Sequence, residues 1–385
     1  MKIHLGVIFG GNSVEHEISI ITALQNIEHL DTDKYEIFPI FLTKDNKLFH
    51  HPSFFELSTF ASFKEEDYKE YIFQKDDNKL FLKQKKNPLE KNYIDVLFPI
   101  VHGTNVEDGK LQGYLNRFDV PVIGPTPLSG AIGQDKAVMK DVLLGNKVSQ
   151  IPYIWVIEKD GINEITHKVE QELSYPVILK PASLGSSVGI EIVENKEELK
   201  YALMRCFSYD DKVVIEKALT NFDEYNISMI GSKEYTKQSC IEKVLKDEEF
   251  LSYEDKYMSG SKSSKTEASQ EQGMASLKRE IPAKLDKKLE RDILRETEKA
   301  FRVLQCNGVV RFDIIIANNT VYINEVNNIP GALSYYFWVA SGMKHKDFLD
   351  EIINLDIQNY YKEKQLIRSF DTNILQLNGK KTTEE

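Results

Sequence analysis

The chain has 385 residues, a formal net charge of -11 and 41% hydrophobic residues, which suffices for two or three domains with buried cores. The negative charge argues against nucleic acid or an anionic membrane as a partner, because both attract basic proteins. No apolar run approaches the ~20 residues needed to span a bilayer, and no signal-peptide pattern precedes the first strand. We therefore expect a cytoplasmic protein that binds neither nucleic acid nor membrane.

The first part of the chain alternates strands and helices. Residues 3–9 predict a buried strand that ends at a glycine turn, and apolar residues at helical spacing predict a helix over 16–29. Further strands are predicted at 35–42 and 93–101, and this alternation favours a parallel sheet with helices on its faces. The polar insert between them, residues 43–92, carries no predicted chemistry.

From about residue 151 the pattern changes to strands in adjacent pairs, which predicts an α+β region with antiparallel pairing. Residues 283–305 predict a long helix, and residues 258–276 are too polar to pack and predict a mobile loop. The residues from about 372 predict a frayed tail. The expected pairs are 176–180 with 188–193, 213–217 with 225–230, and 308–317 with 321–327.

The segment GGNSVEHEIS, residues 10–19, follows the first strand. A strand, a glycine turn and a helix start together expose backbone N–H groups that bind anions. Glu15 at that corner suggests that an ammonium group also binds there. A dinucleotide-type turn with an acid that caps the helix is the alternative interpretation.

The segment HGTNVEDGKLQG, residues 102–113, follows a predicted strand. Its Glu107-Asp108-Gly109 run predicts a tight turn and a helix entry, with the acids as helix caps. His102 at the strand end is a candidate to orient a substrate group, although a structural histidine fits the sequence equally well.

The segment YPVILKPASLGSSVGI, residues 175–190, places Lys180 at the end of an apolar strand. A free ammonium there is costly without an anion partner. The small residues that follow offer N–H and hydroxyl donors and can fold over a polyphosphate, although the spacing is not that of a P-loop.

Two apolar strands near the end carry polar residues at every second position. Arg311 and Asp313 share one face of the first strand, and Glu325 and Asn327 share one face of the second. Oxygen ligands on rigid strands suit a magnesium ion that is shared with phosphates. A salt-bridged patch around Arg311 is the alternative.

In their order along the chain, these motifs resemble those of the D-alanine–D-alanine ligase family of the ATP-grasp superfamily, from Gly10 to about Phe348. The motifs are GG-S-E-E-S, HG--EDG--QG, Asp135-Lys136, KP---GSSVG, YEDKY, R-D and NE-N--PG. The resemblance implies an ATP-grasp fold of three α/β and α+β subdomains, with ATP held between the last two subdomains. The implied domains are an N-terminal parallel α/β domain over 1–125, a central subdomain over 126–220, a C-terminal subdomain over 221–370 and a tail over 371–385.

The resemblance also implies a role for each matching residue. Glu15 would hold the ammonium of the first amino acid, and Arg311 and the Gly331 N–H would stabilise the oxyanion. A hydrogen bond between Ser186 and Tyr257 would close the 258–276 loop as a lid over the site. His102 and Ser334 would contact substrate. Lys136, Lys180 and Lys256 would bind the ATP phosphates, Glu216 and Leu219 the adenine, Glu224 the ribose, and Asp313, Glu325 and Asn327 two Mg²⁺ or Mn²⁺ ions.

Three positions depart from the family pattern. Val106 stands where the family usually has glycine, and Asn328 stands where it usually has threonine. Tyr336 replaces the usual serine five residues after Gly331, in the region that would hold the carboxylate of the second substrate.

The resemblance implies that ATP activates one D-alanine as an acyl phosphate, which the amine of a second D-alanine then attacks, for peptidoglycan synthesis in a homodimeric enzyme. Close alternatives are a D-alanine–D-lactate or D-alanine–D-serine ligase, or another ATP-grasp carboxylate–amine ligase. Tyr257 after Lys256 favours the dipeptide. A nucleotide-binding regulator without turnover has little use for Arg311 as an oxyanion donor, and a NAD-dependent oxidoreductase would need a GxGxxG turn.

Overall fold

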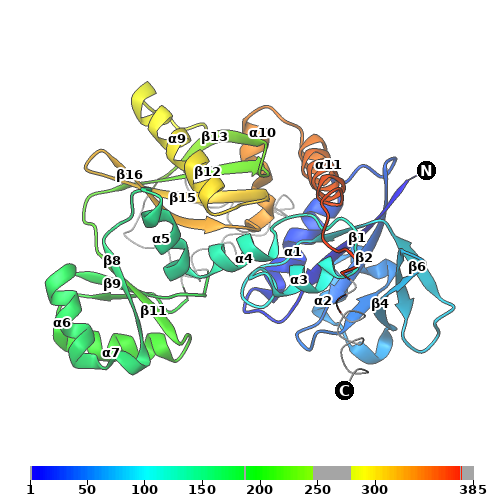
Figure 1. Ribbon diagram of the computed structural model, residues 1–385, viewed down its shortest axis with the longest axis horizontal. Helices are drawn as coiled ribbons and strands as arrows, with labels where there is room; N and C mark the ends of the chain where they lie inside the picture. Colours follow the sequence, from blue (N-terminus) through cyan, green and yellow to red (C-terminus); the bar gives the residue numbers. More distant parts are fainter. Residues whose placement is uncertain (1, 186–187, 246–278, 373, 375–385) are drawn as a thin grey trace, which may run out of the picture.

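The computed structural model describes residues 2–185, 188–245, 279–372 and 374, and it contains three β-sheets that follow one another along the chain (Figure 1). The first sheet includes parallel strands, whereas all neighbouring strands of the other two are antiparallel. This confirms the expected combination of α/β and α+β parts.

The first sheet is built on three parallel strands. The central strand β1 (Ile3–Gly10) pairs with β2 (Tyr35–Leu42) on one side and with β7 (Val96–Pro99) on the other. These strands are apolar along most of their length because helices and loops cover both faces. Helix α1 (His16–Ile27) follows β1 and packs against it. The predicted parallel core is therefore confirmed.

The insert over residues 43–92 extends this sheet, which the sequence analysis did not predict. Strands β3 (Leu48–His50), β4 (Glu70–Asp76), β5 (Lys79–Gln84) and β6 (Lys91–Ile94) add antiparallel neighbours in the order β6-β5-β4-β3-β2-β1-β7. The strand predicted at 93–101 is therefore two strands, β6 and β7. Three short helices complete the insert: η1 (Pro52–Phe55), α2 (Leu57–Ala61) and η2 (Glu65–Asp67).

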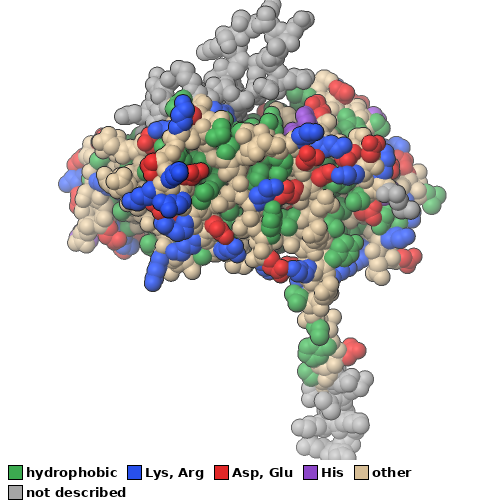
Figure 2. All heavy atoms as spheres, turned by 90° about the horizontal axis from the view of Figure 1, so that it is seen from above, with side chains coloured by type: hydrophobic (Ala, Val, Ile, Leu, Met, Phe, Trp, Pro, Cys, Tyr) green, Lys and Arg blue, Asp and Glu red, His purple; other side chains and the backbone are tan. Residues whose placement is uncertain are grey.

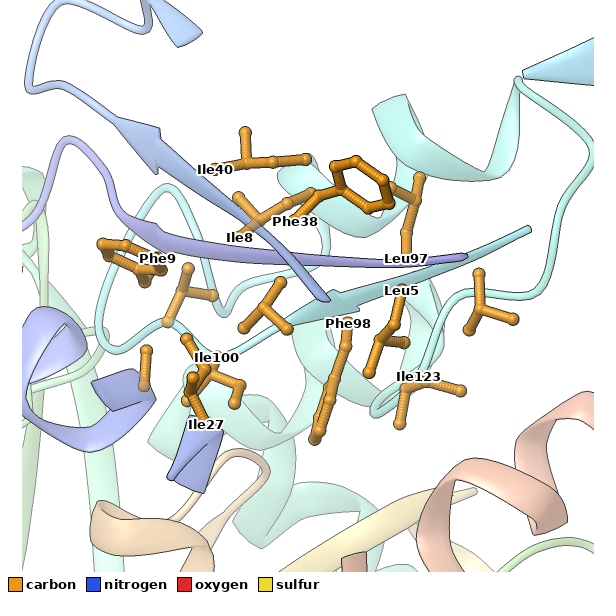
Figure 3. Packing of buried hydrophobic residues seen from close by; sticks show 14 of the residues in the cluster. Leu5, Ile8, Phe9, Ile27, Phe38, Ile40, Leu97, Phe98, Ile100 and Ile123 are labelled. Atoms are coloured by element: carbon orange, nitrogen blue, oxygen red, sulfur yellow. The ribbon is translucent and has the colours of Figure 1, made fainter. Parts of the chain in front are cut away.

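Figure 3 shows the core between this sheet and its helices. Leu5, Leu97 and Phe98 come from the parallel strands, Ile27 comes from α1, and Ile123 comes from the segment that follows α3 (Lys110–Asn116). Each of these side chains is at most 5% exposed. Their burial anchors the loops at the ends of β1 and β7, which carry two of the motifs singled out in the sequence.

The second sheet has four strands, in the order β10-β9-β11-β8. Helices α6 (Ile162–Glu172) and α7 (Lys196–Phe207) pack on it and bury their apolar sides against its strands. The pairing of β9 with β10 confirms the first predicted pair. The strands are β8 (Tyr153–Ile157), β9 (Val177–Pro181), β10 (Glu191–Val193) and β11 (Lys212–Lys217), and a short helix η3 (Glu158–Asp160) follows β8.

The third sheet has five strands, in the order β14-β13-β12-β15-β16, with helix α9 (Lys287–Val303) packed on it. The hairpin of β15 and β16 confirms the third predicted pair. The predicted pairing of 213–217 with 225–230 is wrong, because β11 and β12 belong to different sheets although a short link joins them. The strands are β12 (Asp223–Gly231), β13 (Thr236–Val244), β14 (Arg279–Glu280), β15 (Gly308–Ala317) and β16 (Thr320–Asn327).

Helices α4 (Pro127–Gln134) and α5 (Lys136–Gly145) connect the first sheet to the second. Met139 and Leu143 of α5 belong to the same apolar core as the third sheet. The residue bounds of the domains remain a prediction. The boundary expected at residue 126 assigns α5 to the central subdomain, whereas these two side chains of α5 pack in the core of the third sheet.

The chain returns to the first sheet at its end. After η6 (Gly331–Ser334) and α10 (Tyr335–Ala340), helix α11 (His345–Glu363) packs its apolar side into the core of the first sheet (Figure 1). The last described residues project from the body, and acidic and basic side chains are mixed over the face drawn in Figure 2. Within the described residues, no helix is both long and apolar enough to cross a membrane.

Asp356 of α11 joins three segments that lie far apart in the sequence. Its buried carboxylate accepts hydrogen bonds from the Gly124 N–H at 2.8 Å and from Asn307 Nδ2 at 2.7 Å. Asn307 Nδ2 also donates to the Gly124 carbonyl at 2.8 Å. Burial raises the pKa of Asp356 to about 7 against the effect of these donors. The carboxylate thus links Gly124, in the segment after α3, to the residue that precedes β15.

Replacing Asp356 with alanine should destabilise the protein by about 1–3 kcal/mol, because two partly buried donors, the Gly124 N–H and Asn307 Nδ2, lose a hydrogen bond to the carboxylate. Urea unfolding measures this change. Asp347→Ala removes an exposed carboxylate from the first turn of the same helix and should cost less than about 1 kcal/mol. Equal losses in the two variants would show that the buried contacts of Asp356 do not matter.

Candidate active site

A buried carboxylate and two lysines lie where the second sheet meets α5. Glu216 on β11 and Lys180 on β9 are diagonal neighbours, because the register places Lys180 opposite Val214. Lys180 Nζ lies 2.7 Å from Glu216 Oε2, and Lys140 Nζ of α5 lies 2.8 Å from Oε1. Burial alone would raise the pKa of Glu216, but the two ammonium groups lower it to about 2. Glu216 is therefore ionised.

Lys136 connects α5 with the third sheet. It is the first residue of α5, after the capping residue Asp135, and its side chain is nearly buried. Its Nζ donates to the Leu184 carbonyl at 2.6 Å and lies 3.0 Å from Glu325 Oε1 on β16. One predicted phosphate ligand therefore touches one predicted metal ligand.

The β15–β16 hairpin gathers the other predicted ligands on one face. The alternation in the sequence predicted that each pair shares one face of its strand, and the register places Asp313 opposite Glu325 and Arg311 opposite Asn327. The Arg311 guanidinium binds both oxygens of Asp313, with Nε–Oδ1 at 2.6 Å and Nη2–Oδ2 at 2.9 Å. Asn327 Nδ2 donates to Asp313 Oδ2 at 3.3 Å.

These contacts neutralise the site internally. Lys180 is paired with Glu216, Lys136 with Glu325, and Arg311 with Asp313. Buried charges need such partners, because an isolated ion loses several kcal/mol of hydration. An anionic ligand and a cation that arrive together can exchange partners with these pairs without leaving a charge unpaired. This arrangement suits a polyphosphate that binds with a metal.

Glu15 lies at the start of α1 and faces two glycine loops. Its carboxylate is so close to Gly103 that a Cβ there would lie 2.9 Å from Oε2, and at Gly185 the corresponding distance is 3.2 Å. The loops after β1, β7 and β9 therefore converge on this carboxylate. A negative group at that junction can hold an ammonium group, as the sequence predicted for Glu15.

His102 lies at the end of the segment after β7 and is bound on two sides. Its backbone N–H donates to Ser19 Oγ at 2.9 Å, and its Nε2 is 3.0 Å from Thr22 Oγ1. Burial lowers the pKa of His102 to about 4, so the ring is neutral near pH 7. Thr22 Oγ1 also accepts from the Ala332 N–H at 3.4 Å. His102 thus supports the 331–334 segment through Thr22.

The segment after β16 has an unusual backbone. Ala332, Leu333 and Ser334 all have positive φ angles of 49–54°, which non-glycine residues adopt at a cost. The Ser334 Oγ and the Tyr336 hydroxyl are buried and have no hydrogen-bond partner among the described residues. Buried hydroxyls normally find partners, so these two are candidates to bind a ligand.

Of the two acids that were expected to cap the following helix, Asp108 accepts the N–H of Lys110, the first residue of α3, at 3.3 Å, whereas Glu107 does not cap it. Its buried carboxylate accepts hydrogen bonds from the Gly103 N–H at 3.0 Å and from the Ile329 N–H at 2.9 Å. Gly109, the residue before α3, has no side chain that could cap the helix. Glu107 therefore fixes the loop after β7 to the chain two residues before Gly331.

The remaining predicted residues are placed as follows. Leu219 lies half-exposed in the link between β11 and β12, and Glu224 lies on β12 opposite Ile315 of β15. Ser186, Lys256, Tyr257 and the proposed lid over 258–276 lie outside the described residues.

Sequence reasoning missed Lys140 and the role of Glu107. Lys140 lies four residues after Lys136, next to the buried Met139 and one turn before the buried Leu143. A lysine on the apolar side of a helix, one turn from a motif lysine, was the available signal. The second hydrogen bond of Glu107 gives no local signal, because its donor Ile329 is 222 residues away.

The stability contribution of Glu107 should depend on pH. Burial, with the nearby Glu15 charge, raises its folded pKa from 4.5 to about 7. The folded state therefore binds more protons than the unfolded state between these values, and stability falls as the pH rises through them.

Urea unfolding at several pH values should show that Glu107→Gln lacks this loss. Asp108→Asn, whose carboxylate binds Lys110 at the surface, should keep the pH profile of the wild type. A Glu107→Gln profile parallel to the wild type would contradict the assignment.

Comparison with known proteins agrees with this geometry. Residues 4–125 match the family model described as D-ala D-ala ligase N-terminus, and residues 144–354 match D-ala D-ala ligase C-terminus. A D-alanine–D-alanine ligase of Thermosipho melanesiensis is 35% identical over 97% of this chain and 99% of its own.

Two solved structures share the fold. The D-alanine–D-alanine ligase from Coxiella burnetii has a TM-score of 0.80 at 26% identity, and the alignment covers 95% of this chain and 97% of that one. A D-Ala:D-Ser ligase from Enterococcus faecalis has a TM-score of 0.77 at 24% identity, with 92% and 100% coverage. The chain therefore belongs to the D-alanine–D-alanine ligase family and has its ATP-grasp fold.

Proposed function

We propose that this protein joins two D-alanines with ATP to give D-alanyl-D-alanine, ADP and phosphate for peptidoglycan synthesis. The observation that carries the proposal is a set of three cation–carboxylate pairs: one within the second sheet, one from α5 to β16 and one within β15. A ligase of this kind needs cations for the phosphates and acids for a metal within one site. Both are present, and they neutralise each other.

The first step requires alignment more than a protein nucleophile. The carboxylate of the first D-alanine attacks the γ-phosphate of ATP, with Glu15 holding its ammonium group. Lys136 and Lys180 would leave their acid partners to bind the transferred and adjacent phosphates. Glu216 and Leu219 would contact the adenine, and Glu224 the ribose.

The second step needs donors for a developing oxyanion. The amine of the second D-alanine attacks the acyl carbon, and phosphate leaves. Arg311 is held by Asp313 in a fork that fixes its direction, and the Gly331 N–H follows the segment that Glu107 anchors. Donors that are fixed before the reaction stabilise charge without reorganisation.

The residues at the hairpin fit magnesium. Asp313, Glu325 and Asn327 offer oxygen atoms on one face, which is the ligand type that Mg²⁺ prefers. Within the described residues, no three acidic, histidine or cysteine side chains form a metal cluster, so phosphate oxygens and the Asn327 amide would complete the shell. Bound Mg²⁺ would neutralise charge on the phosphates.

The second amino acid is assigned to D-alanine from the family, and the fold leaves D-serine and D-lactate as alternatives, because a D-Ala:D-Ser ligase has the same fold. Ser334 and Tyr336, with unpartnered buried hydroxyls, would contact its carboxylate. Phosphate release with D-alanine as first substrate and D-alanine, D-serine or D-lactate as second decides among them. Dominant release with D-lactate or D-serine would overturn the assignment. A homodimer in the cytoplasm is part of the same proposal.

Glu325→Gln should reduce dipeptide synthesis by at least about a hundredfold while the protein stays folded, because the metal loses a carboxylate and Lys136 loses its partner. Dipeptide formation with saturating Mg²⁺ and circular dichroism measure the two effects. Glu298→Gln, on the exposed side of α9 where Glu298 pairs with Arg302, is the matched control and should behave like the wild type. Normal synthesis by Glu325→Gln would remove Glu325 from the metal site.

Glu15→Gln should weaken binding of the first D-alanine by about tenfold to a hundredfold and spare ATP, because a charge-assisted hydrogen bond to the ammonium is lost. Calorimetry with each ligand separates the effects. Glu17→Gln, an exposed neighbour in the first turn of α1, should bind both ligands normally. A larger loss for ATP than for D-alanine would contradict this role.

A further inference from the structure

Lys140 is a buried cation to which the proposed reaction assigns no task. Its side chain is 1% exposed, and its Nζ lies 2.8 Å from Glu216 Oε1 and 3.4 Å from Gln150 Oε1. Burial lowers its pKa, and the Glu216 charge opposes this effect. Burying a lysine ammonium costs hydration free energy, which an ion pair of good geometry offsets. Glu216 already pairs with Lys180, so Lys140 is a second cation on the same carboxylate.

The two lysines that contact Glu216 differ in how far their side chains are enclosed. Lys180 is 13% exposed and lies at the end of β9, beside the loop that would cover the phosphates. Lys140 is enclosed by α5, β11 and the Tyr153 ring, 5.4 Å from its Nζ. When Lys180 turns towards a phosphate, Lys140 is the cation that stays. Glu216 then keeps one charged partner.

We propose that Lys140 is a positioning residue that keeps Glu216 an ionised acceptor while ATP is bound, so that the site selects a 6-amino purine over a 6-oxo purine. The proposal rests on the proposed function, in which Glu216 faces the adenine.

The selection follows from hydrogen-bond chemistry. An ionised carboxylate only accepts hydrogen bonds, so it binds the amino group at C6 of adenine and repels the carbonyl at C6 of hypoxanthine. Each oxygen of Glu216 lies beside one lysine, Oε1 beside Lys140 and Oε2 beside Lys180, and a carboxylate oxygen can accept more than one hydrogen bond. An acceptor site therefore remains for a base. Without Lys140, a buried Glu216 would take up a proton and could donate to the 6-oxo group.

The test compares ATP and ITP, which differ in the base alone. Calorimetry with Mg²⁺ and without D-alanine gives the ratio of the two dissociation constants. Wild type should prefer ATP, and Lys140→Met should lower that preference by about tenfold or more, since a charged hydrogen bond is exchanged for a neutral one. Lys168→Met removes a lysine that pairs with Glu164 on the surface of α6 and should leave the ratio unchanged.

A double-mutant cycle with Glu216→Gln keeps the proposal testable if Lys140→Met alone fails to fold. Lys140→Met/Glu216→Gln leaves no unpaired carboxylate, and its ATP/ITP ratio should equal that of Glu216→Gln alone. A further change on adding Lys140→Met, or a wild-type ratio in a folded Lys140→Met variant, would overturn the inference. Failure of the wild type to bind ATP would instead overturn the proposed function.

Discussion

The organisation of this protein depends on the mutual neutralisation of acids and bases in its interior. Lys140 and Lys180 pair with Glu216, Lys136 pairs with Glu325, and Arg311 pairs with Asp313. None of these charges could be buried alone, because the loss of hydration exceeds what packing returns. Two of these pairs connect separate parts, Lys140 of α5 with Glu216 of the second sheet and Lys136 of α5 with Glu325 of β16, and they hold these parts together at one place.

The same pairs explain why the site can be both stable and reactive. Each predicted phosphate ligand in the described part of the chain is paired with an acid. In the proposed function, phosphates would replace the acid partners of Lys136 and Lys180 and the metal would replace the cation partner of Glu325, so the net charge of the interior would change little. Binding would then be an exchange of partners, which avoids the cost of keeping unpaired charges in the site.

Two buried carboxylates outside these pairs join the parts of the chain. Glu107 links the loop after β7 to the segment before Gly331, and Asp356 links α11 to Gly124 and the start of β15. Both accept backbone N–H groups, which fixes position more firmly than apolar contact does, because a hydrogen bond has a direction. The first sheet is thereby held against the third, with the predicted substrate residues between them.

The sequence by itself determined the parallel core of the first sheet, the β15–β16 hairpin and the shared strand faces of Arg311 with Asp313 and of Glu325 with Asn327, because these follow from local periodicity. It did not determine that β11 and β12 enter different sheets, or that the insert continues the first sheet, because partner choice depends on distant strands. Only the tertiary structure assigned Glu107 to Ile329 and Lys140 to Glu216. A contact between residues far apart in the chain leaves no periodic trace in either segment.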